Sequence, residues 1–187
     1  VDFYDQQVAN AGAGGSECDL DFYLAACPSV GTGTWTYSGP GTASFSPNAS
    51  DPAATVTVTA YGAYSFTWTE VNGTCSDAAT FTMNFYQQPV AVTGLGGDEC
   101  DLDFLLNATP SVGVGVWSQT SGPGNSTFSN TVSPTALVTV DTYGSYIFTW
   151  TETNGVCSDS RDVIVNFYEQ PVANAGTGGN ECALDFV

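Results

Sequence analysis

The chain has 187 residues, 19 acidic residues against one basic residue, no histidine and a formal net charge of −18. So acidic a surface repels phosphate groups, which argues against nucleic acid and anionic membranes as partners. Apolar residues make up 42% of the chain and aromatic residues 13%, so a folded core is expected despite the charge. No apolar run approaches a membrane span, and we expect no membrane insertion in this segment.

A repeat of 82 residues organises the chain. The segment Glu-Cys-Asp-Leu-Asp-Phe stands at 17–22 and 99–104 and returns as Glu-Cys-Ala-Leu-Asp-Phe at 181–186. Self-similarity at a fixed period indicates a tandem array, and a unit of this size can bury its own core. We predict the last strand of a preceding repeat at 1–6, complete repeats at 7–88 and 89–170, and the first strands of a following repeat at 171–187.

The first half of each repeat is predicted to form strands. Its opening segment alternates apolar and polar residues, which indicates a half-buried strand with its cysteine on the inner face. A strand around Trp35 or Trp117 follows and ends at a Ser-Gly-Pro-Gly turn, and a short strand contains Phe45 or Phe128. The inward positions of the opening strand are Cys18, Leu20, Phe22 and Leu24 in the first repeat and Cys100, Leu102, Phe104, Leu106 and Ala108 in the second.

The second half is also read as strands. Thr/Val-rich strands are predicted at 54–60 and 136–142, and alternating aromatic residues mark strands around 64–68 and 146–150. Asn-Gly at 72–73 and 154–155 indicates a hairpin into a last strand at 75–86 and 157–168. No stretch has helical periodicity, so the predicted fold class is all-β: tandem immunoglobulin-like β-sandwich repeats.

Several motifs resemble polycystic-kidney-disease (PKD) domains. They are Pro-Val-Ala-Asn-Ala-Gly at 171–176, Trp-x-x-x-Ser-Gly-Pro-Gly at 117–124, the Tyr-Gly-x-Tyr-x-Phe-Thr pattern at 143–149 and the Asn-Gly turn. The resemblance covers each repeat and implies a PKD-like sandwich. Arrays of such domains are similar to the repetitive regions of giant secreted surface proteins and adhesins of gliding bacteria, and to accessory modules of secreted polysaccharide-degrading enzymes.

Each complete repeat carries one recurring cysteine pair. The recurrence favours disulfides within each repeat, Cys18–Cys75 and Cys100–Cys157, and therefore an oxidising, extracellular location. Metal binding is the alternative, but widely spaced cysteines without histidine rarely form zinc sites. Two cysteines are predicted to be unpaired within this segment, namely Cys27, which has Thr109 at its matching position, and Cys182.

The sequence offers little catalytic chemistry. Without histidine there is no imidazole base and no Ser-His-Asp triad, so we expect no enzyme. The glycine clusters at 12–15, 94–97 and 176–179 have no helix after them to bind a phosphate, and we interpret them as connections between strands. The recurring Trp and Tyr residues have inward parity and are predicted to form the core rather than a sugar-binding platform.

Acidic residues surround the first cysteine of each repeat. Clustered oxygen ligands suit Ca²⁺, and the predicted disulfides would bring one further Asp beside each cluster. The candidate ligands are Glu17, Asp19, Asp21 and Asp77 in the first repeat and Glu99, Asp101, Asp103 and Asp159 in the second. We favour the alternative of a solvated acidic face, because Ala183 replaces the middle Asp in the third copy. No cofactor other than calcium is expected.

The joints between repeats are short and nearly identical. Asn-Phe-Tyr-(Gln/Glu)-Gln-Pro-Val runs from the last strand of one repeat into the next without a Gly/Ser spacer, and its proline stiffens the crossing. We predict fixed geometry between repeats and a rod-like chain. The predicted joint residues are Phe85, Tyr86 and Pro89 at one joint and Phe167, Tyr168 and Pro171 at the next.

The function predicted from these features is structural: the repetitive shaft of an extracellular cell-surface adhesin or protein filament. The expected partners are neighbouring repeats of the same chain and other copies in a filament. A carbohydrate-binding or accessory module of a secreted enzyme is the alternative, and it would require exposed aromatic residues on one face. Donor-strand polymerisation is disfavoured because one added strand cannot complete the partial repeat at 171–187.

Overall fold

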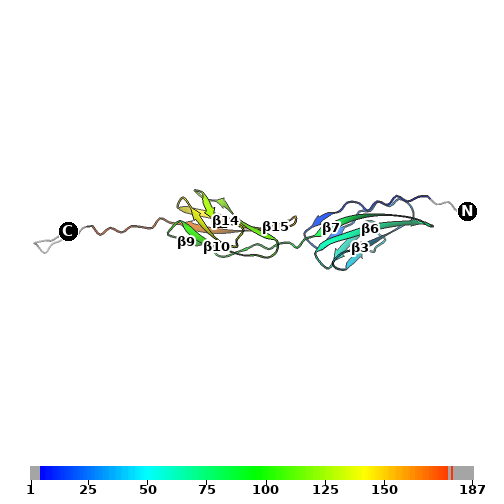
Figure 1. The fold of residues 1–187 in the computed structure, drawn as a ribbon, viewed down its shortest axis with the longest axis horizontal. Helices are drawn as coiled ribbons and strands as arrows, with labels where there is room; N and C mark the ends of the chain where they lie inside the picture. The colour runs from blue at the N-terminus through cyan, green and yellow to red at the C-terminus, as the bar shows by residue number, and fades with distance from the viewer. Residues whose placement is uncertain (1–4, 177, 179–187) are drawn as a thin grey trace, which may run out of the picture.

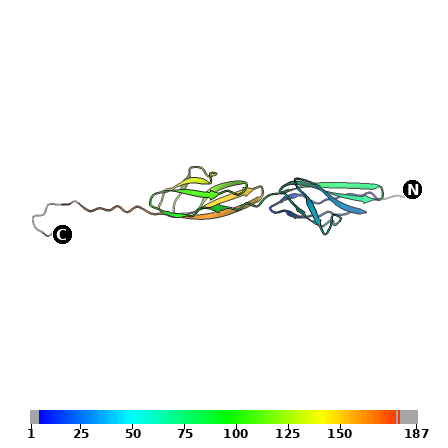
Figure 2. The same cartoon turned by 90° about the horizontal axis from the view of Figure 1, so that it is seen from below.

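The computed structural model describes residues 5–176 and 178. Two β-sandwich domains follow one another along the long axis of the molecule (Figures 1 and 2). Each has its own hydrophobic core, one running from Ala11 to Phe85 and the other from Ala91 to Phe167. Within the described residues no helix is long and apolar enough to cross a membrane. Cys182 and most of the partial repeats predicted at the two ends lie outside the described residues.

The first domain consists of seven strands in two sheets. The strands are β1 (Gly15–Glu17), β2 (Asp21–Tyr23), β3 (Thr32–Ser38), β4 (Ala43–Ser46), β5 (Thr55–Val58), β6 (Gly62–Asn72) and β7 (Cys75–Phe85). One sheet has the order β1-β7-β6-β3 and the other the order β2-β5-β4. The long antiparallel pair β6–β7 forms the centre of the larger sheet.

The second domain repeats this arrangement with one more strand. Its strands are β8 (Val92–Thr93), β9 (Gly97–Glu99), β10 (Asp103–Thr109), β11 (Val114–Ser121), β12 (Ser126–Phe128), β13 (Thr135–Val140), β14 (Gly144–Asn154) and β15 (Cys157–Phe167). The sheet orders are β11-β14-β15-β9 and β12-β13-β10-β8. The predicted all-β class is confirmed, and every strand predicted from Trp35 or Trp117 onward is present in its domain.

The hairpin before the last strand differs from the prediction by one residue. Asn72 pairs with Cys75, so the loop residues are Gly73 and Thr74 rather than Asn-Gly. Gly73 has φ +64°. A glycine with positive φ at the first loop position is the feature of a type II′ turn, whose twist matches that of the two strands.

Paired tryptophans form the centre of each core. Trp35 and Trp68 are buried with ring centroids 5.1 Å apart, and Trp117 and Trp150 repeat the pair at 5.2 Å. All four indole nitrogens donate hydrogen bonds within the core: Trp35 to the Asp51 carbonyl, Trp117 to the Pro134 carbonyl, Trp68 to Glu70 and Trp150 to Glu152. The prediction that these aromatics are core residues is confirmed.

The opening strand of the second domain changes sheets at its glycine cluster. β8 pairs with β10, whereas β9 pairs in parallel with β15 in the opposite sheet. A Cβ on Gly96, within the crossing, would lie 1.7 Å from the carbonyl oxygen of Ile164, so glycine is required there. A Cβ on Gly14 would likewise lie 1.9 Å from the Thr82 carbonyl oxygen in the first domain. In the second-domain cluster, Gly94 and Gly96 lie between two strands, as predicted, whereas Gly97 already begins β9.

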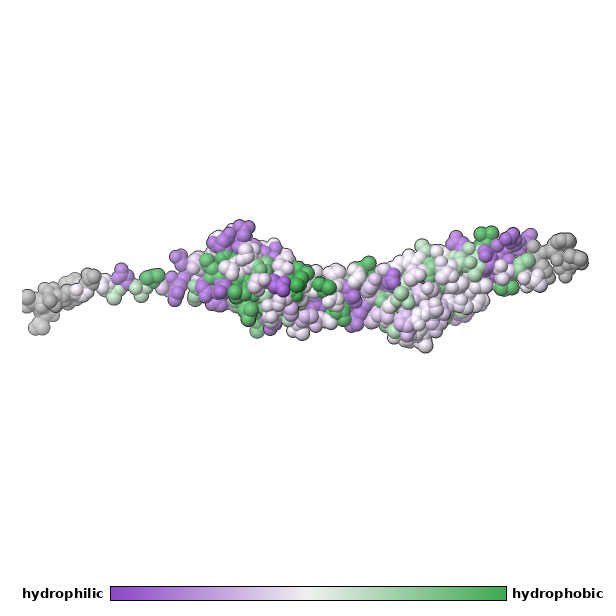
Figure 3. All heavy atoms as spheres, in the orientation of Figure 1, coloured by the Kyte–Doolittle hydropathy of each residue, from purple (hydrophilic) through white to green (hydrophobic). Residues whose placement is uncertain are grey.

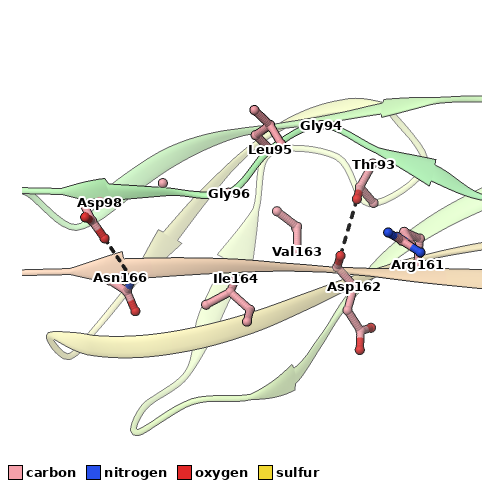
Figure 4. Close-up of a pocket in the computed structure, with 11 residues that line it drawn as sticks. Thr93, Gly94, Leu95, Gly96, Asp98, Arg161, Asp162, Val163, Ile164 and Asn166 are labelled. Carbon is pink, nitrogen blue, oxygen red and sulfur yellow. Dashed lines mark hydrogen bonds between the residues drawn. The ribbon is translucent and has the colours of Figure 1, made fainter.

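A shallow groove of ≈ 630 Å³ lies between this crossing and β15 (Figure 4). Thr93 donates a hydrogen bond to the Asp162 carbonyl at one end, and Asn166 donates to the Asp98 carboxylate at the other. Leu95 points away from β15 and is 95% exposed. On the face shown in Figure 3, apolar residues form small groups separated by polar ones.

We expect Gly115→Ala to destabilise the second domain. The added Cβ would lie 1.9 Å from Cζ2 of Trp150, which is fully packed and cannot move aside. Overpacking of this kind costs about 1–3 kcal/mol. Chemical unfolding followed by tryptophan fluorescence measures it, with Gly178→Ala as the control because a Cβ there meets nothing within 4 Å. Equal stability of the two variants would contradict the packing argument.

Candidate functional site: the junction between the domains

A disulfide joins the two domains. Cys18 of the first domain is bonded to Cys157 of the second, with Cα atoms 5.6 Å apart and a sequence separation of 139 residues. Cys75, Cys100 and Cys27 are free thiols. The predicted pairings Cys18–Cys75 and Cys100–Cys157 are therefore wrong.

Strand direction explains the error. β1 runs parallel to β7, and Glu17 is opposite Phe85 at the C-terminal end of β7. Cys75 begins β7, so it lies about 33 Å from that end at ~3.3 Å per strand residue. A disulfide requires Cα atoms within about 7 Å. Cys18 is consequently at the pole where the chain leaves its domain, the C-terminal pole, and Cys75 is at the pole where the chain enters, the N-terminal pole.

The inner-face prediction for the cysteines also fails. Cys100 is exposed and Cys18 is half-buried, whereas Leu24 and Leu106 of the same alternation are buried. Leu24 and Leu106 follow the predicted alternation, whereas each cysteine lies in the bend between two strands, at the C-terminal pole of its domain.

The linker is bound to the second domain by side-chain hydrogen bonds. Asn154 donates to the Gln87 carbonyl at 2.9 Å, and the Gln88 amide donates to the Ser158 carbonyl at 2.8 Å. Farther along, the backbone N–H of Ala91 donates to Asp159 at 2.8 Å. These contacts join the linker to the β14–β15 hairpin and the start of β15, which bears Cys157.

Tyr86 forms the contact between the linker and the hairpin turn. A Cβ on Gly155 would lie 2.5 Å from the Tyr86 ring, so the ring lies directly on this glycine. The Tyr86 N–H donates to the Glu17 carbonyl at 2.8 Å, which keeps Tyr86 beside Cys18. Sγ of Cys157 lies 3.9 Å from the same carbonyl. A crevice of ≈ 380 Å³ opens beside these groups, lined by residues of both domains.

The predicted joint residues are divided between the joint and the cores. Tyr86 is at the junction, and Pro89 is buried there. Phe85 and Phe167 instead belong to the cores of their own domains, where they pack edge-on against Tyr64 and Tyr146. Tyr168 and Pro171, at the outer end of the second domain, are exposed.

A buried glutamate anchors the start of each domain, and the sequence analysis missed it. Glu152 is 1% exposed and accepts hydrogen bonds from the Trp150 indole and from the backbone and hydroxyl of Ser111. The Ser111 hydroxyl oxygen in turn accepts from the Val90 N–H at 2.9 Å. The carboxylate thereby fixes the residue that follows Pro89. Glu70, Ser29 and Val8 repeat the arrangement.

These hydrogen bonds keep the glutamates ionised. Burial raises the pKa of Glu152, but the hydrogen bonds from Ser111 and Trp150 together outweigh it, and the pKa lies below its ordinary value. The same balance lowers the pKa of Glu70. The sequence does contain a pattern that could have revealed these glutamates, namely Trp-x-Glu in a strand whose inward positions are aromatic. Because the Glu is two residues after an inward Trp, its carboxylate lies on the same buried face.

The eight candidate calcium ligands do not come together as predicted. Asp77 accepts the Ala9 N–H at the N-terminal pole, about 26 Å from Glu17 at ~3.3 Å per strand residue. Asp159 has the matching role toward Ala91. Grouping Asp77 and Asp159 with the acidic clusters of their own repeats was therefore wrong. Among the described residues, no three acidic or cysteine side chains are arranged to hold a metal ion.

Part of each cluster does remain close. The Asp103 N–H donates to Asp101 at 3.4 Å, as the Asp21 N–H does to Asp19. A hydrogen bond with Asp101, and its charge, raise the pKa of Asp103 above its ordinary value, with a smaller effect from Glu99. The repulsion among these carboxylates is what an exposed acidic face produces.

Comparisons with known proteins support the fold. No protein-family profile and no characterised protein sequence matches the chain. Extracellular domains 3–5 of Drosophila OTK are similar, with a TM-score of 0.55 and 9% identity over 88% of this chain and 62% of that one. Immunoglobulin domains 1–5 of Sidekick-1 give 0.51 and 12% over 89% of this chain and 40% of theirs. The chain thus spans less than two thirds of either structure.

A PKD domain is also similar to part of the chain. The PKD domain from KIAA 1837 protein is 22% identical over 46% of this chain and 92% of its own, with a TM-score of 0.40. At these identities structural similarity defines the fold only. The sheet topology and the similarity to the OTK and Sidekick-1 domains show that the chain has consecutive β-sandwich domains of immunoglobulin-like fold.

Peptide mapping of the oxidised chain should recover Cys18 linked to Cys157. The Cys75 and Cys100 thiols should be alkylated under native conditions, because neither is bonded to another cysteine among the described residues. Cys18→Ser should release Cys157 for alkylation, slowly under native conditions because Cys157 is 1% exposed in the closed junction, and completely after unfolding. Recovery of a Cys18–Cys75 peptide would contradict the junction described here.

Glu152→Gln should lose stability in a pH-dependent manner. A lowered pKa means that the carboxylate stabilises the folded state above its ordinary pKa of 4.5 and ceases to do so as the pH falls through the folded-state value. We expect a loss of about 2 kcal/mol at pH 7, typical of hydrogen bonds to a charged group, and a loss that becomes smaller as the pH falls below 4.5. Urea unfolding across this pH range measures it, with the exposed Glu169→Gln as the control. A loss independent of pH would refute the role of the charge.

Proposed function

We propose that this chain belongs to the repetitive shaft of an extracellular surface protein or filament, and that it has a structural rather than an enzymatic role. The observation that supports this most directly is the junction. A disulfide, two linker hydrogen bonds and the contact of Tyr86 with Gly155 hold consecutive domains end to end. A binding or catalytic module has no need of so constrained a connection.

The disulfide supports an extracellular location. Structural disulfides persist in oxidising compartments and are rare where thiols are kept reduced. The acidic surface agrees with this setting, because a high like charge keeps long chains soluble and separate. Membership of a bacterial adhesin of the gliding type, with neighbouring repeats as partners, is the specific form of this proposal and rests on the PKD-like motifs of the sequence.

The alternative of a carbohydrate-binding module has less support. All four tryptophans are buried. The exposed tyrosines among the described residues are spread over both domains: Tyr23 on β2, Tyr37 on β3, Tyr61 and Tyr143 just before β6 and β14, and Tyr168 just after β15. Tyr23 and Tyr37 belong to different sheets. A sugar-binding platform needs several coplanar rings on one face. We therefore retain the shaft as the proposed function.

Small-angle scattering of the oxidised chain tests this proposal. We expect one elongated shape, unchanged by Cys27→Ser, because Cys27 takes no part in the junction. The Cys18→Ser, Cys157→Ser double variant should fit only a wider ensemble of inter-domain angles, since the linker hydrogen bonds then act alone. A broad ensemble for the oxidised wild-type chain would refute the shaft.

A further inference from the structure

Two free cysteines occupy the positions of the two bonded ones. Cys100 follows β9 as Cys18 follows β1, and the pairing of Glu99 with Phe167 matches that of Glu17 with Phe85. Cys75 begins β7 as Cys157 begins β15. One free thiol therefore lies at the C-terminal pole of the second domain, and the other lies at the N-terminal pole of the first.

The outer poles bear the same groups as the junction but are less covered. Cys157 is 1% exposed, whereas Cys75 is half-buried. Cys18 is half-buried and Cys100 is exposed. Tyr86 is half-buried beneath the second domain, and its counterpart Tyr168 is 54% exposed. In each comparison the residue at the outer pole is more exposed than its counterpart at the junction between the two domains.

The backbone at these poles is already arranged as in the junction. The Tyr168 N–H donates to the Glu99 carbonyl at 2.8 Å, the same length as its counterpart at Tyr86. At the other end of the molecule, Asn72 donates to the Asp5 carbonyl as Asn154 does to that of Gln87. Gly73, at φ +64°, matches Gly155 at +61°.

We propose that Cys75 and Cys100 are two halves of further junctions, each closed by an adjoining repeat of the same type. Cys100 bonds the cysteine that begins the last strand of the following repeat, and Cys75 bonds the cysteine after the first strand of the preceding one. Every repeat is then covalently joined to both neighbours by disulfides between adjacent repeats, and no disulfide forms within a repeat.

The chemistry of each closure is thiol–disulfide exchange. A small-molecule disulfide such as oxidised glutathione accepts the two electrons: one protein thiolate attacks it and releases one thiol. The second protein thiolate then displaces the other, leaving one protein disulfide and two reduced small thiols. The exposed Cys100 is accessible for the first attack.

This inference deepens the proposed shaft function and rests on it for its biological use, but it is tested separately. The full chain is extended at Val187 by Leu24–Gln88 of a second copy, which preserves the 82-residue period and completes a third repeat. The extended chain is refolded in a glutathione redox buffer, and its disulfides are mapped. We expect Cys18–Cys157 and, in addition, Cys100 bonded to the appended Cys75, so that the alkylation of Cys100 seen in the 187-residue chain is lost.

Matched variants decide among the outcomes. Cys100→Ser should leave the appended Cys75 reactive, and Cys27→Ser should change nothing. A bond between Cys182 and the appended Cys75, which is the pairing within one repeat, would overturn the proposal, as would a Cys100 that stays reactive. Small-angle scattering from the same sample tests the shaft independently of the disulfide pairing. A chain that has the expected disulfides but a bent shape would refute the shaft without contradicting the proposed pairing.

Discussion

Parallel pairing between the first and last strands of each domain determines how this molecule is connected. Because β1 runs in the same direction as β7, the chain crosses its domain from pole to pole before the rest of the sandwich is formed. The cysteine after β1 is thereby delivered to the next domain, and the cysteine that begins the last strand faces the previous one. An antiparallel first strand would have placed both cysteines at one pole and permitted a bond within the domain.

The sequence contained most of the fold. Period-two alternation, the Thr/Val-rich segments and the turn residues located the later strands, and inward parity identified Trp35, Trp68, Trp117 and Trp150 as core. The opening segment was harder. Its glycines were interpreted as a connection, whereas in the first domain Gly15 already belongs to β1. A glycine-rich strand has few side chains that could form an alternating pattern. The sequence therefore does not indicate which strand it pairs with or in which direction it runs.

The cysteine connectivity could not be obtained from the repeat. In a periodic chain, pairing within a repeat and pairing with the next repeat involve the same two positions and differ only by one period. The recurrence shows which two cysteine positions form a pair, but it is the same whether they bond within a repeat or between adjacent repeats. The direction of the short first strand decides between these two pairings. The buried glutamates were missed for a related reason. A single acidic residue at an inward position can be recognised as a buried hydrogen-bond acceptor only once its serine donor, 41 residues away in sequence, is known to lie beside it.

The position of the disulfide also determines how tension would pass through the pair of domains. Force applied at the N-terminal side follows the segment that ends in β1, crosses the sulfur atoms from Cys18 to Cys157 and continues along β15. Both segments run from pole to pole and are already extended, close to the maximal length of a polypeptide. The intervening loop, with β3, β6, β11 and β14, bears no load while the bond is intact. Both cores are then attached to a nearly inextensible path and need not unfold when it is pulled.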